Sequence, residues 1–129
     1  MVSHTVLIVD DEEEILKLLD IELSSEGYQV VKAHNGHEAV KKAKDFLPSL
    51  IVLDILMPDL DGGQVIKLLK ADAATRNIPV IFLTAVLTKE EERFKQMGVT
   101  VEHVSYPAIA KPFNVPDLLG EIQRLVHKR

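Results

Sequence analysis

The chain has 129 residues, of which 47% are hydrophobic and 27% charged, and its formal net charge is −5. This composition is typical of a soluble globular protein, and the length predicts one domain with a substantial core. The acidic balance argues against unspecific nucleic-acid binding, which needs a basic face. The absence of cysteine excludes disulfides and thiolate metal sites. No stretch approaches the roughly 20 apolar residues of a membrane span, and no signal peptide is recognisable, so we expect a cytoplasmic protein.

The first half of the chain predicts strand–helix units. An apolar run at 6–9, typical of a strand buried on both faces, precedes a helical stripe that ends before Gly27. Asn35 is placed to cap a second helix, and another apolar run follows at 50–53. Residues 57–63 are rich in Pro, Asp and Gly, which predicts a loop before a third helix.

The second half continues the alternation. An apolar run at 80–83 is followed by a capping-box pattern at 88–91 for a fourth helix. A shorter run at 108–110 precedes Asn114, which can cap a fifth helix. Such alternation predicts right-handed βαβ units and a parallel sheet. We therefore predict an α/β protein with a doubly wound, five-stranded parallel sheet and helices on both faces, as a single domain over 1–129 without an output domain.

Polar residues directly follow four of the apolar runs. They are Asp10 and Asp11, Asp54, Thr84, and Lys111. The carboxyl ends of parallel strands share one edge of the sheet, where ligands of doubly wound folds bind. Three carboxylates, a hydroxyl and an ammonium should therefore meet there, a set that suits a divalent cation and a phosphoryl group.

Each of these residues also has a purely structural interpretation. Asp11 could cap the first helix, and Asp54 could close its strand in an Asx turn. Lys111, which precedes a proline, could simply be an exposed lysine. A cap does not explain why Asp10 is acidic too, because neighbouring carboxylates repel by about 4 kcal/mol at about 4 Å and an effective dielectric near 20. A bound cation would reverse that repulsion.

The same residues resemble the receiver domain of bacterial response regulators in two-component signalling. The matching segments are Val-Asp-Asp-Glu at 9–12, Asp-Ile-Leu-Met-Pro-Asp-Leu-Asp-Gly at 54–62, Leu-Thr-Ala at 83–85, and Ala-Lys-Pro-Phe at 110–113. The resemblance covers nearly the whole chain, in order. It implies a flavodoxin-like fold with strand order 2-1-3-4-5.

The resemblance also implies a role for each residue in phosphoryl transfer. Asp54 would accept a phosphoryl group from the phosphohistidine of a sensor kinase or phosphotransfer protein. Lys111 would contact that group, and Thr84 would move toward it on activation. The peptide bond between Lys111 and Pro112 is expected to be cis.

By the same resemblance, the reaction needs Mg²⁺ as cofactor. Asp11, Asp54 and the backbone carbonyl of Leu56 would be direct ligands, and Asp10 would bind the ion through water. These are the oxygen ligands that Mg²⁺ prefers.

The resemblance implies a signalling domain that catalyses only its own phosphorylation and dephosphorylation. Phosphorylation would switch the binding of an output protein, or self-dimerisation through the fourth and fifth helices. Two alternatives stay open. A Mg²⁺-dependent phosphatase with an aspartyl nucleophile usually has a second Asp where this chain has Leu56. A pseudo-receiver that is never phosphorylated would not need this complete set of polar residues.

One segment departs from the receiver pattern. Receivers have an aromatic residue three positions before the lysine, where this chain has Ala108, and the link over 99–107 is longer than usual. Tyr106 lies five positions before the lysine, directly ahead of a proline. We therefore expect 101–106 to form an extended surface loop or the start of a strand, with Tyr106 not filling the space behind Thr84.

Overall fold

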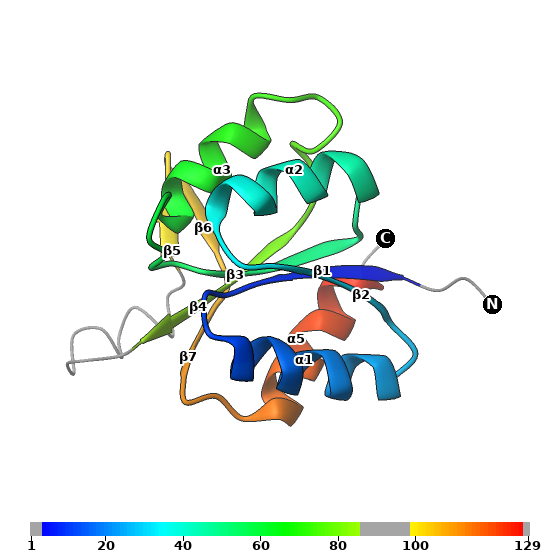
Figure 1. The fold of residues 1–129 in the computed structure, drawn as a ribbon. Helices are drawn as coiled ribbons and strands as arrows, with labels where there is room; N and C mark the ends of the chain where they lie inside the picture. Colours follow the sequence, from blue (N-terminus) through cyan, green and yellow to red (C-terminus); the bar gives the residue numbers. More distant parts are fainter. Residues whose placement is uncertain (1–3, 86–98, 128–129) are drawn as a thin grey trace.

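The computed structural model describes residues 4–85 and 99–127, and a five-stranded parallel sheet forms its centre (Figure 1). The strand order is β2-β1-β3-β4-β7. Because β7 is the fifth strand of this sheet in chain order, the predicted order 2-1-3-4-5 is confirmed. The strands are β1 (Thr5–Val9), β2 (Gln29–Ala33), β3 (Leu50–Asp54), β4 (Val80–Ala85) and β7 (Ala108–Lys111).

Helices cover both faces of the sheet, as Figure 1 shows. One face carries α1 (Glu13–Ser25) and α5 (Val115–Val126), and the other carries α2 (Gly36–Phe46) and α3 (Gly62–Lys70). The predicted doubly wound architecture is therefore confirmed. The predicted fourth helix and its capping box lie outside the described residues. No helix in residues 4–85 and 99–127 is long and apolar enough to cross a bilayer.

The core has two layers, one on each face of the sheet. In β1, Leu7 and Val9 pack with the helices α2 and α3, whereas Val6 and Ile8 pack with α1 and α5. All four side chains are at most 1% exposed. Burial on both faces explains why the strands are continuous apolar runs in the sequence.

Two predicted helix caps are confirmed, and the alternative interpretation of Asp11 as a helix cap is wrong. The side chains of Asn35 and Asn114 accept hydrogen bonds from the backbone at the starts of α2 and α5. The first helix instead begins after Glu12, whose side chain makes no capping bond. Because the helix starts one residue later than the cap interpretation requires, Asp11 lies outside it as an exposed side chain.

The start of α3 fixes the loop that follows β3. Asp61 and Gln64 form a capping box, which the sequence analysis did not single out. A Cβ atom at Gly62 would lie 2.6 Å from the ring of Phe82 on β4. Only glycine allows so close an approach, so this end of α3 is seated directly on the sheet.

The unusual segment before β7 forms a separate antiparallel hairpin of β5 (Val99–Val101) and β6 (Val104–Tyr106). Its two-residue turn is Glu102-His103, with φ values of 48° and 69°. Positive φ at both central residues is the geometry of a type I′ turn, whose twist matches that of the flanking strands. The expected strand start at 101–106 is thus part of a complete hairpin.

Tyr106 is buried, so its expected place on a surface loop is wrong. It is 7% exposed, and its ring packs edge-on against Phe82, with 5.7 Å between ring centroids. The Nζ atom of Lys70, the last residue of α3, lies 5.7 Å from the centroid of the Tyr106 ring. A tyrosine ring carries a large apolar surface, so burial against Phe82 is favoured over exposure.

Candidate functional site

Three carboxylates meet at the carboxyl edge of the sheet. Asp10 directly follows β1, and Asp54 is the last residue of β3. Carboxylate oxygens of these two residues and of Asp11 lie within 4.8 Å of one another. Asp10 is 0% and Asp54 6% exposed, whereas Asp11 is open to solvent. The structure therefore brings together the acidic residues that the sequence pattern predicted to converge.

Lys111 joins the two buried carboxylates. Its Nζ atom lies 2.6 Å from Oδ2 of Asp10 and 3.4 Å from Oδ2 of Asp54. Glu12, to which the sequence analysis gave no role, adds a third carboxylate oxygen at 3.5 Å. Burial alone would lower the pKa of Lys111, but Asp10 and the other carboxylates outweigh it and raise the pKa. The lysine is therefore a fixed positive charge. The peptide bond to Pro112 is cis, as predicted.

Backbone N–H groups hold the other oxygen of each buried carboxylate. The N–H of Glu12 donates to Oδ1 of Asp10 at 2.9 Å, and the N–H of Leu56 donates to Oδ1 of Asp54 at 3.2 Å. In both cases the donor lies two residues after the aspartate, as in an Asx turn. Each carboxylate thus has one oxygen turned to its own loop and one turned to Lys111.

The pKa of Asp54 is raised from its ordinary value of 3.8 to about 6. Burial is the largest cause, and the negative charge of Asp10 adds to it. Lys111 and the N–H of Leu56 oppose the shift without cancelling it. The carboxylate is thus destabilised in its charged form, and a nearby cation would reverse this effect.

The donor set fits a divalent cation. Oδ2 of Asp10 is buried, and no hydrogen-bond donor of suitable geometry reaches it from the described residues. The ammonium of Lys111 lies 2.6 Å from that oxygen and offsets its negative charge. A buried acidic oxygen beside Asp11 and Asp54 suits an ion that prefers oxygen ligands, such as Mg²⁺. Leu56 lies two residues beyond Asp54, in the loop at the same edge.

Thr84 lies near this edge on the neighbouring strand. Asp54 pairs with Leu83 in the β3–β4 register, so Thr84 is one residue farther along. Side chains two residues apart on a strand share a face, which places Thr84 with Phe82 on the α3 face of the sheet. That face also holds Tyr106. Thr84 itself is half-buried.

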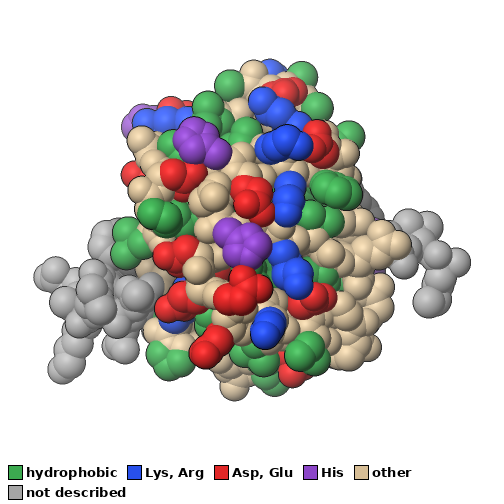
Figure 2. All heavy atoms as spheres, in the orientation of Figure 1, with side chains coloured by type: hydrophobic (Ala, Val, Ile, Leu, Met, Phe, Trp, Pro, Cys, Tyr) green, Lys and Arg blue, Asp and Glu red, His purple; other side chains and the backbone are tan. Residues whose placement is uncertain are grey.

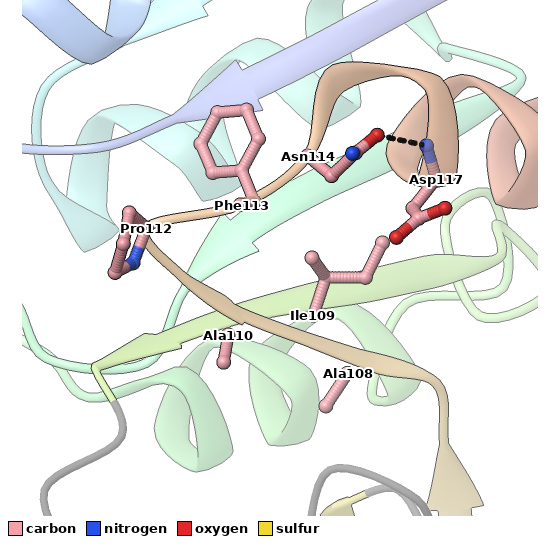
Figure 3. A pocket seen from close by; sticks show the side chains of 7 residues that line it. All are labelled: Ala108, Ile109, Ala110, Pro112, Phe113, Asn114 and Asp117. Atoms are coloured by element: carbon pink, nitrogen blue, oxygen red, sulfur yellow. Dashed lines mark hydrogen bonds between the residues drawn. The ribbon is translucent and has the colours of Figure 1, made fainter.

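A separate pocket of about 410 Å³ lies between β7 and the start of α5 (Figure 3). Ile109 points toward the first turn of α5, where the side chain of Asn114 accepts a hydrogen bond from the N–H of Asp117 at 3.1 Å. Asp117 is the only charged residue among those that line the pocket, so the pocket lacks the cluster of charges found at the carboxylate site. Its lining is Ala108, Ile109, Ala110, Pro112, Phe113, Asn114 and Asp117.

A cluster of ionisable side chains on the neighbouring surface was not predicted from the sequence. The ring nitrogens of His34 lie 2.9 Å from Glu13 and 3.3 Å from Glu38, at the starts of α1 and α2. His34 lies in the loop between β2 and α2, 21 positions from Glu13, so only its i,i+4 spacing to Glu38 is visible in the sequence. Figure 2 shows acidic and basic side chains interspersed over one face of the molecule, without a large field of one sign.

Comparison with known proteins establishes the family. Residues 6–123 match the response regulator receiver domain. The chain therefore belongs to the receiver domain family of two-component response regulators.

Similar proteins include both single-domain and longer regulators. The chain is 38% identical over 120 residues to the polar-differentiation response regulator DivK of Brucella anthropi, covering 92% of this chain and 93% of DivK. It is 37% identical over 126 residues to the alkaline phosphatase synthesis transcriptional regulatory protein PhoP of Bacillus subtilis. That match covers 98% of this chain but only 50% of PhoP, so the chain spans about half the length of that relative.

Solved structures give the same fold. The chemotaxis protein CheY4 of Vibrio cholerae matches with a TM-score of 0.80 and 27% identity, covering 96% of this chain and 99% of CheY4. The signal receiver domain of a histidine kinase from Syntrophus aciditrophicus matches with a TM-score of 0.82 and 31% identity, covering 98% and 92% of the two chains. These likenesses agree with the predicted flavodoxin-like fold.

Proposed function

We propose that Asp54 is the phosphoacceptor of this receiver domain and that its phosphorylation requires Mg²⁺. The observation that supports the proposal is the burial and orientation of the Asp54 carboxylate. It is 6% exposed, its Oδ1 is held by the N–H of Leu56, and its Oδ2 faces Lys111 at 3.4 Å. Asp10 and Asp11 complete the cluster within 4.8 Å. A carboxylate oriented in this way can act as a nucleophile.

In the proposed reaction, an oxygen of Asp54 forms a bond to phosphorus while the bond between phosphorus and the histidine nitrogen of the donor breaks. The released imidazole takes a proton from solvent. Lys111 would turn from the carboxylates to the phosphoryl oxygens and offset their charge. Asp10 and Asp11 would hold Mg²⁺, together with Asp54 and the carbonyl of Leu56. When bound, that ion would neutralise the charge of the carboxylates and of the phosphoryl group.

The partners follow from this chemistry. The chain would act in the cytoplasm, where its donor would be a sensor histidine kinase or phosphotransfer protein. The phosphorylated product would bind an output protein or a second copy of the chain. Thr84 would carry the signal, because it lies one residue beyond the strand position that pairs with Asp54. The face of α5 beside the β7 pocket is our candidate for the output surface.

The two alternatives have less support. A phosphatase of the aspartyl type needs a proton donor two residues after its nucleophile, and Leu56 has an apolar side chain that is 66% exposed. A pseudo-receiver that is never phosphorylated would not need the complete set of polar residues at this edge, which is Asp10, Asp11, Asp54, Thr84 and Lys111. Both alternatives predict no stable phosphoryl group on Asp54, so a labelling experiment separates them from our proposal.

The experiment is incubation with acetyl phosphate and Mg²⁺, followed by intact-protein mass spectrometry. We expect one acid-labile phosphoryl group, no labelling when EDTA replaces Mg²⁺, and no labelling of Asp54→Asn. Asp45→Asn is the matched control, since its carboxylate is 54% exposed and pairs with Lys41 on α2. Full labelling of Asp54→Asn would show that another residue is the acceptor.

A further inference from the structure

The loop after the proposed phosphoacceptor is tied to the start of α2 by Asp59. Oδ1 of Asp59 accepts a hydrogen bond from the N–H of Gly36 at 2.8 Å, and Oδ2 accepts one from the N–H of His37 at 2.9 Å. The next N–H of the helix, that of Glu38, is bound at 2.8 Å by the helix's own cap, Asn35. The first three N–H groups of α2 have no partners within the helix, so side chains from two different loops satisfy them.

The charge of Asp59 suits this position. Burial would raise the pKa of Asp59, but hydrogen bonds from backbone N–H groups, those of His37 and Gly36 first, hold it at about 2. The carboxylate is therefore charged at every pH at which the protein would work. A negative charge at the N-terminus of a helix is also favoured by the helix dipole.

The loop and the helix are in close contact beside this carboxylate. A Cβ atom at Gly36 would lie 2.6 Å from Cβ of Leu60, the residue after Asp59. Only a glycine lets the first turn of α2 approach Leu60 so closely. The contact is thus built from both sides, by a glycine on the helix and by an aspartate and a leucine on the loop.

Elsewhere the loop is held by backbone hydrogen bonds at its base and by Met57 and Leu60, which pack against the core. The N–H of Ile55 donates to the carbonyl of Leu83 at 3.0 Å, and the N–H of Gly62 donates to the carbonyl of Ile55 at 2.8 Å. Between these bonds the chain turns outward, with Leu56 exposed and Asp59 at the contact with α2. The contact of Asp59 with α2 is therefore one of the attachments that set the position of the Leu56 backbone, beside the base of the loop and the packing of Met57.

We propose that Asp59 is a positioning residue that anchors this arc on α2 and thereby holds the backbone of Leu56 at the metal site. This inference rests on the proposed function for its consequence but not for its geometry. The N–H of Leu56 binds Oδ1 of Asp54, so the same anchor also orients the phosphoacceptor. A helix on the far side of the loop thus supports the site without contacting it.

The test compares Asp59→Ala with Asn35→Ala. Each variant removes side-chain hydrogen bonds from the start of α2, but only Asp59→Ala releases the loop. The first readout is hydrogen exchange of the Leu56 amide in EDTA, which needs neither metal nor phosphorylation. We expect exchange about tenfold faster in Asp59→Ala and within about twofold of wild type in Asn35→Ala.

The second readout is the Mg²⁺ concentration for half-maximal phosphorylation by acetyl phosphate. Outer partners of a metal site change affinity by about 10–100-fold, and Asp59 acts one step farther out, so we expect about a fivefold increase in Asp59→Ala. The rate at saturating Mg²⁺ should stay within about twofold of wild type. Asn35→Ala should change neither quantity.

Asp59→Asn provides a conservative variant, because it retains one carbonyl acceptor for the helix. It should fall between wild type and Asp59→Ala in both readouts, and it serves if the alanine variant does not fold. Equal effects of Asn35→Ala and Asp59→Ala, or unchanged Leu56 exchange in both Asp59 variants, would overturn the proposal. If the wild type is not phosphorylated at all, the proposed function fails, while the exchange data still decide whether Asp59 anchors the loop.

Discussion

Asp54→Asn should stabilise the metal-free protein at alkaline pH. The pKa of Asp54 rises from 3.8 to about 6 on folding, which corresponds to about 3 kcal/mol. Between these two pH values the folded state keeps a proton that the unfolded state has lost, so stability falls as pH rises through this window. Above about pH 6 the full cost of the buried charge is present. Asparagine carries no charge and avoids that cost.

The assay is thermal unfolding in EDTA at pH 8 and at pH 4. We expect the melting temperature of Asp54→Asn to exceed that of wild type by about 10 °C at pH 8, and the difference to vanish near pH 4. Asp45→Asn, which changes an exposed carboxylate, should differ from wild type by less than about 0.5 kcal/mol at both values. An Asp54→Asn variant that is no more stable than wild type at pH 8 would refute the reasoning.

Four further predictions concern the metal, the lifetime of the phosphoryl group, the stability of the core and the signal. Mg²⁺ should raise the melting temperature of wild type, and Asp11→Ala should weaken Mg²⁺ binding measured by calorimetric titration. An unchanged melting temperature of wild type in Mg²⁺ would contradict the site. In receivers, the side chains two positions after the phosphoacceptor and two after the threonine help to place the attacking water; here they are Leu56 and Val86, the latter outside the described residues, and neither can form a hydrogen bond. Autodephosphorylation should therefore take minutes to hours, and decay within seconds in a mass-spectrometric time course would show that another group orients the water. Tyr106→Ala should lower the free energy of unfolding by about 3 kcal/mol in urea, because a buried ring is lost. Phosphorylation-dependent partner binding should be retained in Tyr106→Leu and impaired in Thr84→Ala. Loss of binding in Tyr106→Leu would show that the tyrosine is part of the switch.

The convergence of the site could be predicted from the sequence because a parallel sheet fixes it. The apolar runs end on Asp10, Asp54 and Lys111, and parallel strands place these ends at one edge of the sheet, wherever the helices begin and end. The local partners of each residue were harder to predict. The first helix begins one residue later than the cap interpretation of Asp11 requires, and such boundaries depend on packing that the sequence pattern does not contain.

Contacts between distant elements were not predictable. Asp59 and Gly36 are 23 positions apart, and nothing in their spacing indicates that a loop carboxylate binds a helix start. The hairpin before β7 has Glu102-His103 at its turn in place of the Asn-Gly that signals a type I′ turn. The burial of Tyr106 follows from that hairpin, so it was missed as well.

The central claim is that Asp54 carries the phosphoryl group. Borohydride reduces an acyl phosphate of aspartate to homoserine, which marks the position permanently. After treatment with acetyl phosphate and Mg²⁺, then borohydride, peptide mass mapping should find homoserine at position 54 and nowhere else, and none when EDTA replaces Mg²⁺. Homoserine at position 10 or 11, or no homoserine in a labelled sample, would contradict the claim.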